Sequence, residues 1–251
     1  ATWNPKLAYQ FGQALGREAR ARNKYVILGP GINILRTPLC GRNFEYMSED
    51  PYLISQMVVP YIRGVQENDV AACVKHFALN NQEYDRNRIN EQVEERALRE
   101  ISLPGFEAAI REAGALTVMT AYNKFRGDYC SENSYLLNDI LRKEWGFRGV
   151  VMSDWNGTHS TIKAALAGLD VEMGTEGKPY RDWYFARPLI EAVEQGIIAE
   201  EVIDDKVRHV LTVMFGTGMF DPNRSKGSFT TPEHFQLARR VAEEAVVLLK
   251  N

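Results

Sequence analysis

The chain has 251 residues, of which 45% are hydrophobic and 25% are charged, and its formal net charge is −3. This composition is typical of a folded globular protein, and its mixed charges argue against a nucleic-acid-binding face or a polybasic membrane anchor. No apolar stretch approaches the roughly 20 residues of a membrane-spanning helix, so we expect neither nucleic acid nor a membrane as a partner.

Predicted helices and strands alternate along the chain. The first helix begins after Asn4, an N-cap residue that is followed by proline. In chain order there follow a strand at 25–28, a helix from residue 50, a strand at 71–79, a helix at 91–112 interrupted near Pro104, a strand at 116–122, a helix at 135–145, a strand ending at Asp154, a helix at 158–166, a strand at 170–173, and helices at 188–194 and 200–215. This order predicts an α/β fold whose parallel sheet is covered by helices.

The end of the chain has a different character. Residues 216–229 are rich in Gly, Ser and Asn and are predicted to form a loop. Thr231 and Pro232 then predict the start of a last helix, which leads into the apolar residues 246–249.

The most informative residue is Asp154, which ends an apolar run and is followed by Trp155. A buried parallel strand that ends in this way delivers a carboxylate to the mouth of a sheet or barrel, where it can act as nucleophile, base or metal ligand. The alternative is that Asp154 is only the N-cap of the helix expected from Thr158.

Other strand ends also carry polar side chains. Lys75 and His76 end the second strand, Tyr122 ends the third, Arg86 follows the second, and Arg42 lies after the first. In a barrel these groups would converge on one pocket, which suits a neutral, polyhydroxylated substrate. The chain has no glycine-rich phosphate loop and no metal-binding sequence motif.

Each of these residues also has a purely structural interpretation. Lys75 could neutralise a buried acid, and a lone histidine such as His76 is more often a hydrogen-bonded core residue. Arg42 could tie loops together through Glu45, and Tyr122 could belong to the core.

Four segments together resemble glycoside hydrolase family 3, of the β-glucosidase type. They are residues 41–51, 75–83, 119–123 and 151–155. The resemblance implies a retaining exo-acting hydrolase of terminal non-reducing β-D-glucosyl residues, with a β-glucoside or oligosaccharide as substrate and with no metal or organic cofactor.

The resemblance also implies roles for individual residues. Asp154 would be the catalytic nucleophile. The side chains that would bind the sugar are Arg42, Lys75, His76, Arg86 and Tyr122, with Trp155 beside them.

Several alternatives stay open at this point. The same family includes β-xylosidases, α-arabinofuranosidases and exo-glucanases, and a non-catalytic carbohydrate-binding remnant would keep the pocket without the acid. The N-acetylglucosaminidase branch is disfavoured, because residues 78–81 read Ala-Leu-Asn-Asn where that branch has a Pro-Gly-His-Gly loop.

Two departures from the family pattern lead to further expectations. The chain lacks the segment that precedes Ala1 in the family, with its early strands, and the following sandwich domain that supplies the acid/base. We therefore expect a TIM-type (β/α)8 barrel that is incomplete in this chain, with residues 1–215 as its truncated catalytic portion and residues 216–251 leading toward the absent α/β sandwich domain.

A second polypeptide or a cleaved segment would supply the missing strands and the acid/base. The chain by itself would be inactive and would expose large apolar patches.

The peptide backbone from Lys75 to Phe77 is also expected to depart from regular strand geometry. Neighbouring residues of a strand point to opposite faces, yet both Lys75 and His76 would have to reach one sugar. A bulge or a non-proline cis peptide would reconcile the two requirements.

The cysteines leave the cellular compartment open. Cys73 is expected to be a buried strand residue, whereas Cys40 and Cys130 lie in loops that could meet. They could be free thiols or, in an oxidising compartment, a disulfide. No signal peptide is recognisable, and a cytoplasmic, periplasmic or secreted location all remain possible.

Overall fold

The computed structural model describes residues 2–174 and 176–250, so the outer bounds of the two predicted domains, residues 1 and 251, lie outside it. Its parallel sheet has the strand order β1 (Val26–Ile27), β2 (Ala71–Phe77), β4 (Thr117–Thr120) and β7 (Val150–Met152). The predicted fifth strand, 170–173, is reduced to one parallel bridge between Met152 and Val171. The chain therefore forms an α/β fold with a partial (β/α) barrel, as predicted.

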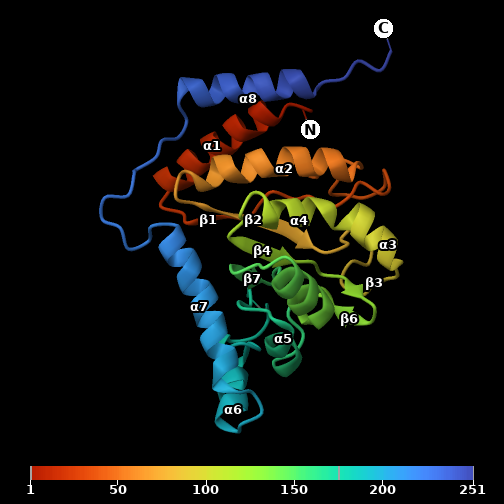
Figure 1. Cartoon of the computed structure of the whole chain (residues 1–251), viewed down its shortest axis with the longest axis vertical. Helices are drawn as coiled ribbons and strands as arrows, with labels where there is room; N and C mark the ends of the chain where they lie inside the picture. Colours follow the sequence, from red (N-terminus) through yellow and green to blue (C-terminus); the bar gives the residue numbers. More distant parts are fainter. Residues whose placement is uncertain (1, 175, 251) are drawn as a thin grey trace.

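Helices cover one face of this sheet (Figure 1). They are α1 (Pro5–Ala21), α2 (Pro51–Gln66), α4 (Pro104–Arg111) and the π-helical segment η3 (Tyr135–Glu144). The predicted N-caps are confirmed, because the Asn4 side chain accepts a hydrogen bond from the backbone of Leu7 and the Asp50 side chain accepts one from the backbone of Tyr52.

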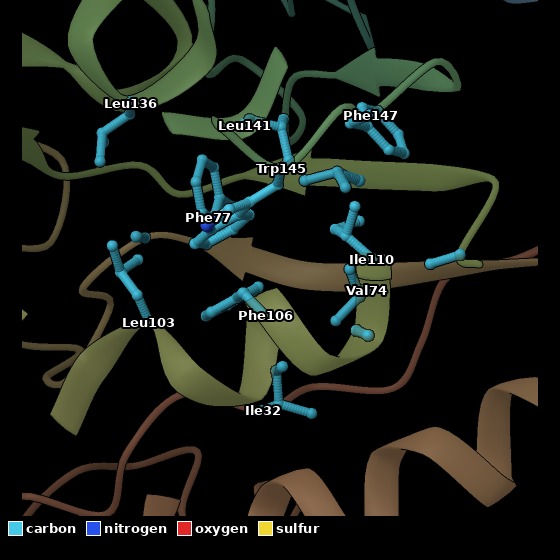
Figure 2. Close-up of a cluster of buried hydrophobic side chains, with 14 of the residues drawn as sticks. Ile32, Val74, Phe77, Leu103, Phe106, Ile110, Leu136, Leu141, Trp145 and Phe147 are labelled. Atoms are coloured by element: carbon cyan, nitrogen blue, oxygen red, sulfur yellow. The ribbon is translucent and has the colours of Figure 1, made fainter. Parts of the chain in front are cut away.

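The core between the sheet and these helices is built around Phe77, at the end of β2. Its ring makes edge contacts with Phe106 of α4 and with Trp145 after η3, at centroid distances of 5.2 and 5.9 Å. Figure 2 shows these side chains together with Leu103 and Ile110 from the α4 region. Because Phe77 is anchored in the core, the end of β2 is held in place beneath the polar edge of the sheet.

The opposite face of the sheet carries a smaller apolar cluster. Its buried members on the strands are Ala71, Cys73, Met119, Val150 and Met152. Val213 of α7 (Glu200–Gly216) packs against them. The prediction that Cys73 is a buried strand residue is confirmed.

The region 90–130 differs from the prediction. Glu91, expected at the start of a helix, belongs instead to β3 (Asn90–Glu91), and the helix follows as α3 (Glu95–Ala97) and the π-helical segment η1 (Leu98–Ser102). Strands β5 (Lys124–Phe125) and β6 (Asp128–Tyr129) form a small second sheet with β3.

The helix expected from Thr158 begins later, as α5 (Ile162–Ala167). Thr161, not Asp154, occupies its N-cap position. The interpretation of Asp154 as a helix cap is therefore wrong.

Of the remaining elements, α6 (Arg187–Glu194) and α8 (Pro232–Ala245) follow the prediction. The short 3-10 helices η2 (Cys130–Glu132) and η4 (Tyr180–Asp182) were not predicted. The predicted loop after residue 216 is present, and α8 crosses over α1 (Figure 1). Cys40 and Cys130 are both buried free thiols. Within the described ranges, the helices fall short of the length and apolar character that membrane crossing requires.

Candidate active site

Asp154 lies at the carboxyl-terminal edge of the sheet, just after β7, and is buried. The Tyr122 hydroxyl donates a hydrogen bond to its Oδ1 over 3.0 Å, and the backbone N–H of Trp155 donates to the same oxygen over 2.8 Å. Nε2 of His76 lies 3.5 Å from the other oxygen, Oδ2. Two short hydrogen bonds thus fix Oδ1, and Oδ2 is the oxygen better placed to react.

Tyr122 is itself held by an arginine. The guanidinium of Arg86 stacks over the Tyr122 ring at 4.3 Å from its centroid, and its Nη1 donates to Oε2 of Glu83 over 2.6 Å. Burial, together with the neighbouring Asp154 carboxylate, raises the pKa of the Tyr122 phenol. The phenol therefore stays protonated and acts as a hydrogen-bond donor to Asp154.

His76 is buried beside Asp154 and is uncharged. Burial, and after it the positive charges of Arg42, Lys75 and Arg86, lower the pKa of His76 to about 2. All three cations thus disfavour a charged His76. The site therefore combines one carboxylate with several cations and with neutral hydrogen-bonding groups.

Arg42 lies in the connection after β1, whereas Lys75 lies within β2. Nε of Arg42 donates a hydrogen bond to Glu45, the contact expected if Arg42 ties loops together. The Arg42 guanidinium also faces the ring of Tyr46, at 5.9 Å from its centroid. Lys75 and Glu45 line one end of a cavity of about 330 Å³. The cavity lies beside the residues that follow β1 and is otherwise walled mainly by apolar side chains of α1 and α2.

The backbone at the end of β2 departs from regular strand geometry, as predicted. The Lys75–His76 peptide is cis, as is Phe77–Ala78, and the register between β2 and β4 shifts between Val74 and Phe77. In this arrangement the His76 ring faces Asp154 while Phe77 remains in the core.

Trp155 completes the set of predicted residues. It follows Asp154 directly in the sequence, and the residue is 43% exposed. An exposed indole offers the flat apolar surface on which a sugar ring can lie. The structure thus brings Tyr122, His76 and the Trp155 backbone into contact with Asp154, and Arg86 into contact with Tyr122.

Three further residues belong to the site that were not among the predicted site residues. The Tyr46 hydroxyl lies 3.3 Å from Nδ1 of His76, and Nδ2 of Asn80 donates to the Tyr46 oxygen over 3.2 Å. The Asn33 side chain hydrogen-bonds both the backbone N–H and the carbonyl of His76, at 2.8 and 2.9 Å. Tyr46 and Asn80 fall within the family-like segments, whereas Asn33 has no signal in the sequence.

Across residues 2–174 and 176–250, no three acidic, histidine or cysteine side chains are clustered as a metal ion would require.

The sequence of this chain is similar to one protein family and to several characterised relatives. Residues 1–213 match the family described as Glycosyl hydrolase family 3 N terminal domain. The beta-glucosidase BoGH3A of Bacteroides ovatus is 51% identical over 261 residues, which cover 100% of this chain and 34% of that protein. Thermostable beta-glucosidase B of Acetivibrio thermocellus is 44% identical over 250 residues, which cover 100% of this chain and 32% of that protein.

Solved structures give the same result. Beta-glucosidase 3B from Thermotoga neapolitana, in complex with glucose, superposes with a TM-score of 0.92 at 43% identity, covering 100% of this chain and 35% of that one. DesR, a beta-glucosidase from Streptomyces venezuelae in complex with D-glucose, superposes with a TM-score of 0.94 at 37% identity, covering 100% and 33%. The chain spans about a third of the length of these relatives. The likeness extends along the whole chain, which therefore belongs to glycosyl hydrolase family 3.

Proposed function

We propose that the complete protein is a retaining β-glucosidase that removes terminal non-reducing β-D-glucosyl residues, with Asp154 as its nucleophile. The observation that carries this proposal is the Asp154 carboxylate, whose Oδ1 is held by Tyr122 and Trp155 while Oδ2 faces His76. Oδ2 attacks the anomeric carbon, the bond to the leaving oxygen breaks, and a glycosyl-enzyme forms. Water then releases the sugar and restores the carboxylate.

The surrounding side chains bind the sugar. Arg42, Lys75 and Arg86 supply charged N–H donors, and His76 and Tyr122 supply neutral ones. Trp155 offers its exposed indole to the ring. This group of donors matches a substrate whose hydroxyl oxygens are acceptors, and the proposed mechanism uses no metal and no organic cofactor.

The second carboxyl group of the mechanism comes from outside this chain. A retaining hydrolase places two carboxyl groups about 5–5.5 Å apart on opposite sides of the scissile bond. Near Asp154, Glu83 is bonded by Arg86 and Asn80, and Glu45 is bonded by Arg42, so these two serve to hold their partners. A further segment, or a second polypeptide, supplies the acid/base.

The early barrel strands come from outside as well. The edge of β1 and the cavity beside it are suited to receive them. In this proposal residues 1–215 form the catalytic barrel portion, and residues 216–251 lead to the sandwich domain.

Relatives at 44–51% identity are named as beta-glucosidases, which favours that specificity over β-xylosidase, α-arabinofuranosidase or exo-glucanase activity. A panel of p-nitrophenyl glycosides, tested on the complete protein, discriminates between these activities. Fastest turnover of the β-D-glucoside supports the proposal, whereas fastest turnover of the β-D-xyloside or α-L-arabinofuranoside contradicts it. Sugar binding without any turnover would instead support the non-catalytic remnant.

The role of Asp154 is tested by substitution and by trapping. Asp154→Asn in the complete protein should lower kcat on the order of 10⁴-fold and leave sugar affinity largely intact, because the carboxylate acts in the transition state. A 2-deoxy-2-fluoro glucoside should label Asp154, as read by peptide mass spectrometry. Labelling of Glu83 or Glu172 instead would overturn the assignment.

A further inference from the structure

A chain of buried hydrogen bonds leads from the Asn80 side chain to the ring of His76. Nδ2 of Asn80 donates to the Tyr46 oxygen over 3.2 Å, and the Tyr46 hydroxyl lies 3.3 Å from Nδ1 of His76. All three side chains are buried, and Tyr46 and His76 also meet edge to face. On its far side the His76 ring reaches Asp154 through Nε2. Every ring nitrogen of this histidine therefore has a defined neighbour.

The direction of each bond follows from donor and acceptor chemistry. Nδ2 of Asn80 also lies 3.0 Å from Oε1 of Glu83, a carboxylate that can only accept, so this end of the amide is the donating nitrogen. Turning the amide over would place its oxygen against that carboxylate. The Tyr46 oxygen consequently accepts from Asn80, and its single proton is left to donate to Nδ1 of His76.

Among the described residues, the Asn33 side chain also offers an acceptor for a proton on Nδ1. Its Oδ1 lies 3.4 Å from Nδ1, but the same oxygen already accepts the His76 backbone N–H over 2.8 Å. On the other side of the ring, Nε2 faces a carboxylate oxygen at 3.5 Å. An unprotonated Nε2 would place two acceptors against each other, whereas a protonated Nε2 donates to Asp154. The uncharged ring carries a single N–H proton. This proton must lie on Nε2, the nitrogen that faces Asp154.

We propose that Tyr46 and Asn80 are positioning residues that hold His76 as the Nε2–H tautomer, so that its one ring proton is directed at Oδ2 of Asp154. This inference deepens the proposed function, on which its catalytic part rests: the same N–H would steady the nucleophile and then donate to a sugar hydroxyl at the mouth of the site. Gly31 is part of the device, because a Cβ at that position would lie 3.0 Å from the Tyr46 ring. The absence of a side chain there lets the ring lie where its hydroxyl meets His76.

The tautomer can be read directly by long-range ¹H–¹⁵N correlation spectra of the complete protein labelled with ¹⁵N-histidine. The His76→Gln variant identifies the signals of this residue. In the wild-type protein we expect Nε2 to give a protonated, pyrrole-type shift and Nδ1 an unprotonated, pyridine-type shift. The opposite pattern would overturn the proposal.

Tyr46→Phe removes the donor to Nδ1 and leaves Asn33 as an acceptor there. The population should move toward the Nδ1–H tautomer by about tenfold, the effect of one buried hydrogen bond. Tyr61→Phe is the matched control, since Tyr61 is a half-buried tyrosine of α2 that lines the largely apolar cavity, and the spectrum of this variant should equal that of the wild type. A folded Tyr46→Phe protein that keeps the wild-type pattern contradicts the proposal.

Asn80→Ala provides the second variant, which decides the matter if Tyr46→Phe does not fold. Without Asn80 the Tyr46 oxygen is free to accept from Nδ1–H, so the population should shift in the same direction by a smaller factor. An unchanged pattern in this variant also counts against the proposal.

Activity of the complete protein tests the catalytic part. Tyr46→Phe should lower kcat/KM about tenfold, and Tyr61→Phe should leave it unchanged. A wild-type protein without glycosidase activity would refute the proposed function but not the tautomer, which the spectra decide independently. Spectra that show the Nδ1–H tautomer in a fully active protein would refute the positioning role of Tyr46 and Asn80 and would leave the proposed function standing.

Discussion

His76 should make the stability of the chain depend on pH. The folded state holds the pKa of this buried histidine at about 2, whereas the unfolded chain titrates near 6.5. Below pH 6.5 the unfolded state binds the proton and the folded state does not. The free energy of unfolding is therefore greatest above pH 6.5 and falls as the pH decreases toward 2, with a slope of at most about 1.4 kcal/mol per pH unit.

Urea unfolding at pH 7 and pH 5 measures this effect when wild type is compared with His76→Gln. The wild type should lose about 2 kcal/mol more than the variant between the two pH values, because glutamine does not titrate. Parallel losses in the two proteins would show that His76 is protonated in the folded state.

Among single residues, the sequence identified those that end strands. Asp154, His76 and Tyr122 could be selected because each follows an apolar run, and the structure brings them together. Tyr46 and Asn33 were not among the predicted site residues, because their contacts with His76 arise when the long connection after β1 folds against the end of β2. Sequence spacing carries no information about such a meeting.

At the level of elements, α1 and α2 pack so closely that glycine is required. A Cβ on Gly12 would lie 2.2 Å from the carbonyl oxygen of Tyr61 in α2, and one on Gly64 would lie 2.3 Å from that of Tyr9 in α1. Gly12→Ala should therefore lower the free energy of unfolding by about 1–3 kcal/mol through overpacking, as measured by urea denaturation.

Gly216→Ala is the control for this prediction. Gly216 is also helical, at the end of α7, but its nearest contact from a new Cβ would be an ordinary 3.5 Å to Leu116. Alanine should be neutral there or stabilise by up to about 1 kcal/mol, because it restricts the unfolded chain and favours the helix. Equal effects at both positions would contradict the packing argument.

Elements were predictable where their end signals were conventional. Asn4 and Asp50 correctly marked helix starts, since their side chains cap the exposed backbone N–H groups. The β5–β6 hairpin was missed because its turn is formed by Arg126 and Gly127, both with positive φ, and not by the Asn-Gly pair that signals such turns. The structure of this hairpin depends on the pairing of β5 with β3, a contact that the local sequence does not indicate.

At the scale of the whole molecule, an apolar surface continues from the open edge of the sheet onto α7. Val207, Leu211 and Phe215 recur every four residues on one face of α7 and are exposed, Phe215 by 68%. A groove of about 360 Å³ beside Val171 joins this face and includes Trp183. Exposed apolar faces next to an unpaired strand edge are typical of surfaces that another segment covers.

The isolated 251-residue chain should therefore lack β-glucosidase turnover and should associate or bind hydrophobic dyes. In the function proposed above, another segment supplies the remaining wall and the acid/base of the site, and the sheet edge at β1 and the threefold greater length of the relatives support this proposal. Light scattering, dye fluorescence and p-nitrophenyl glucoside hydrolysis, each compared with the complete protein, measure these properties. Replacing Leu211 and Phe215 with lysine should reduce dye binding and association without restoring activity. A monomeric chain with turnover equal to that of the complete protein would show that the described residues already form a finished active site.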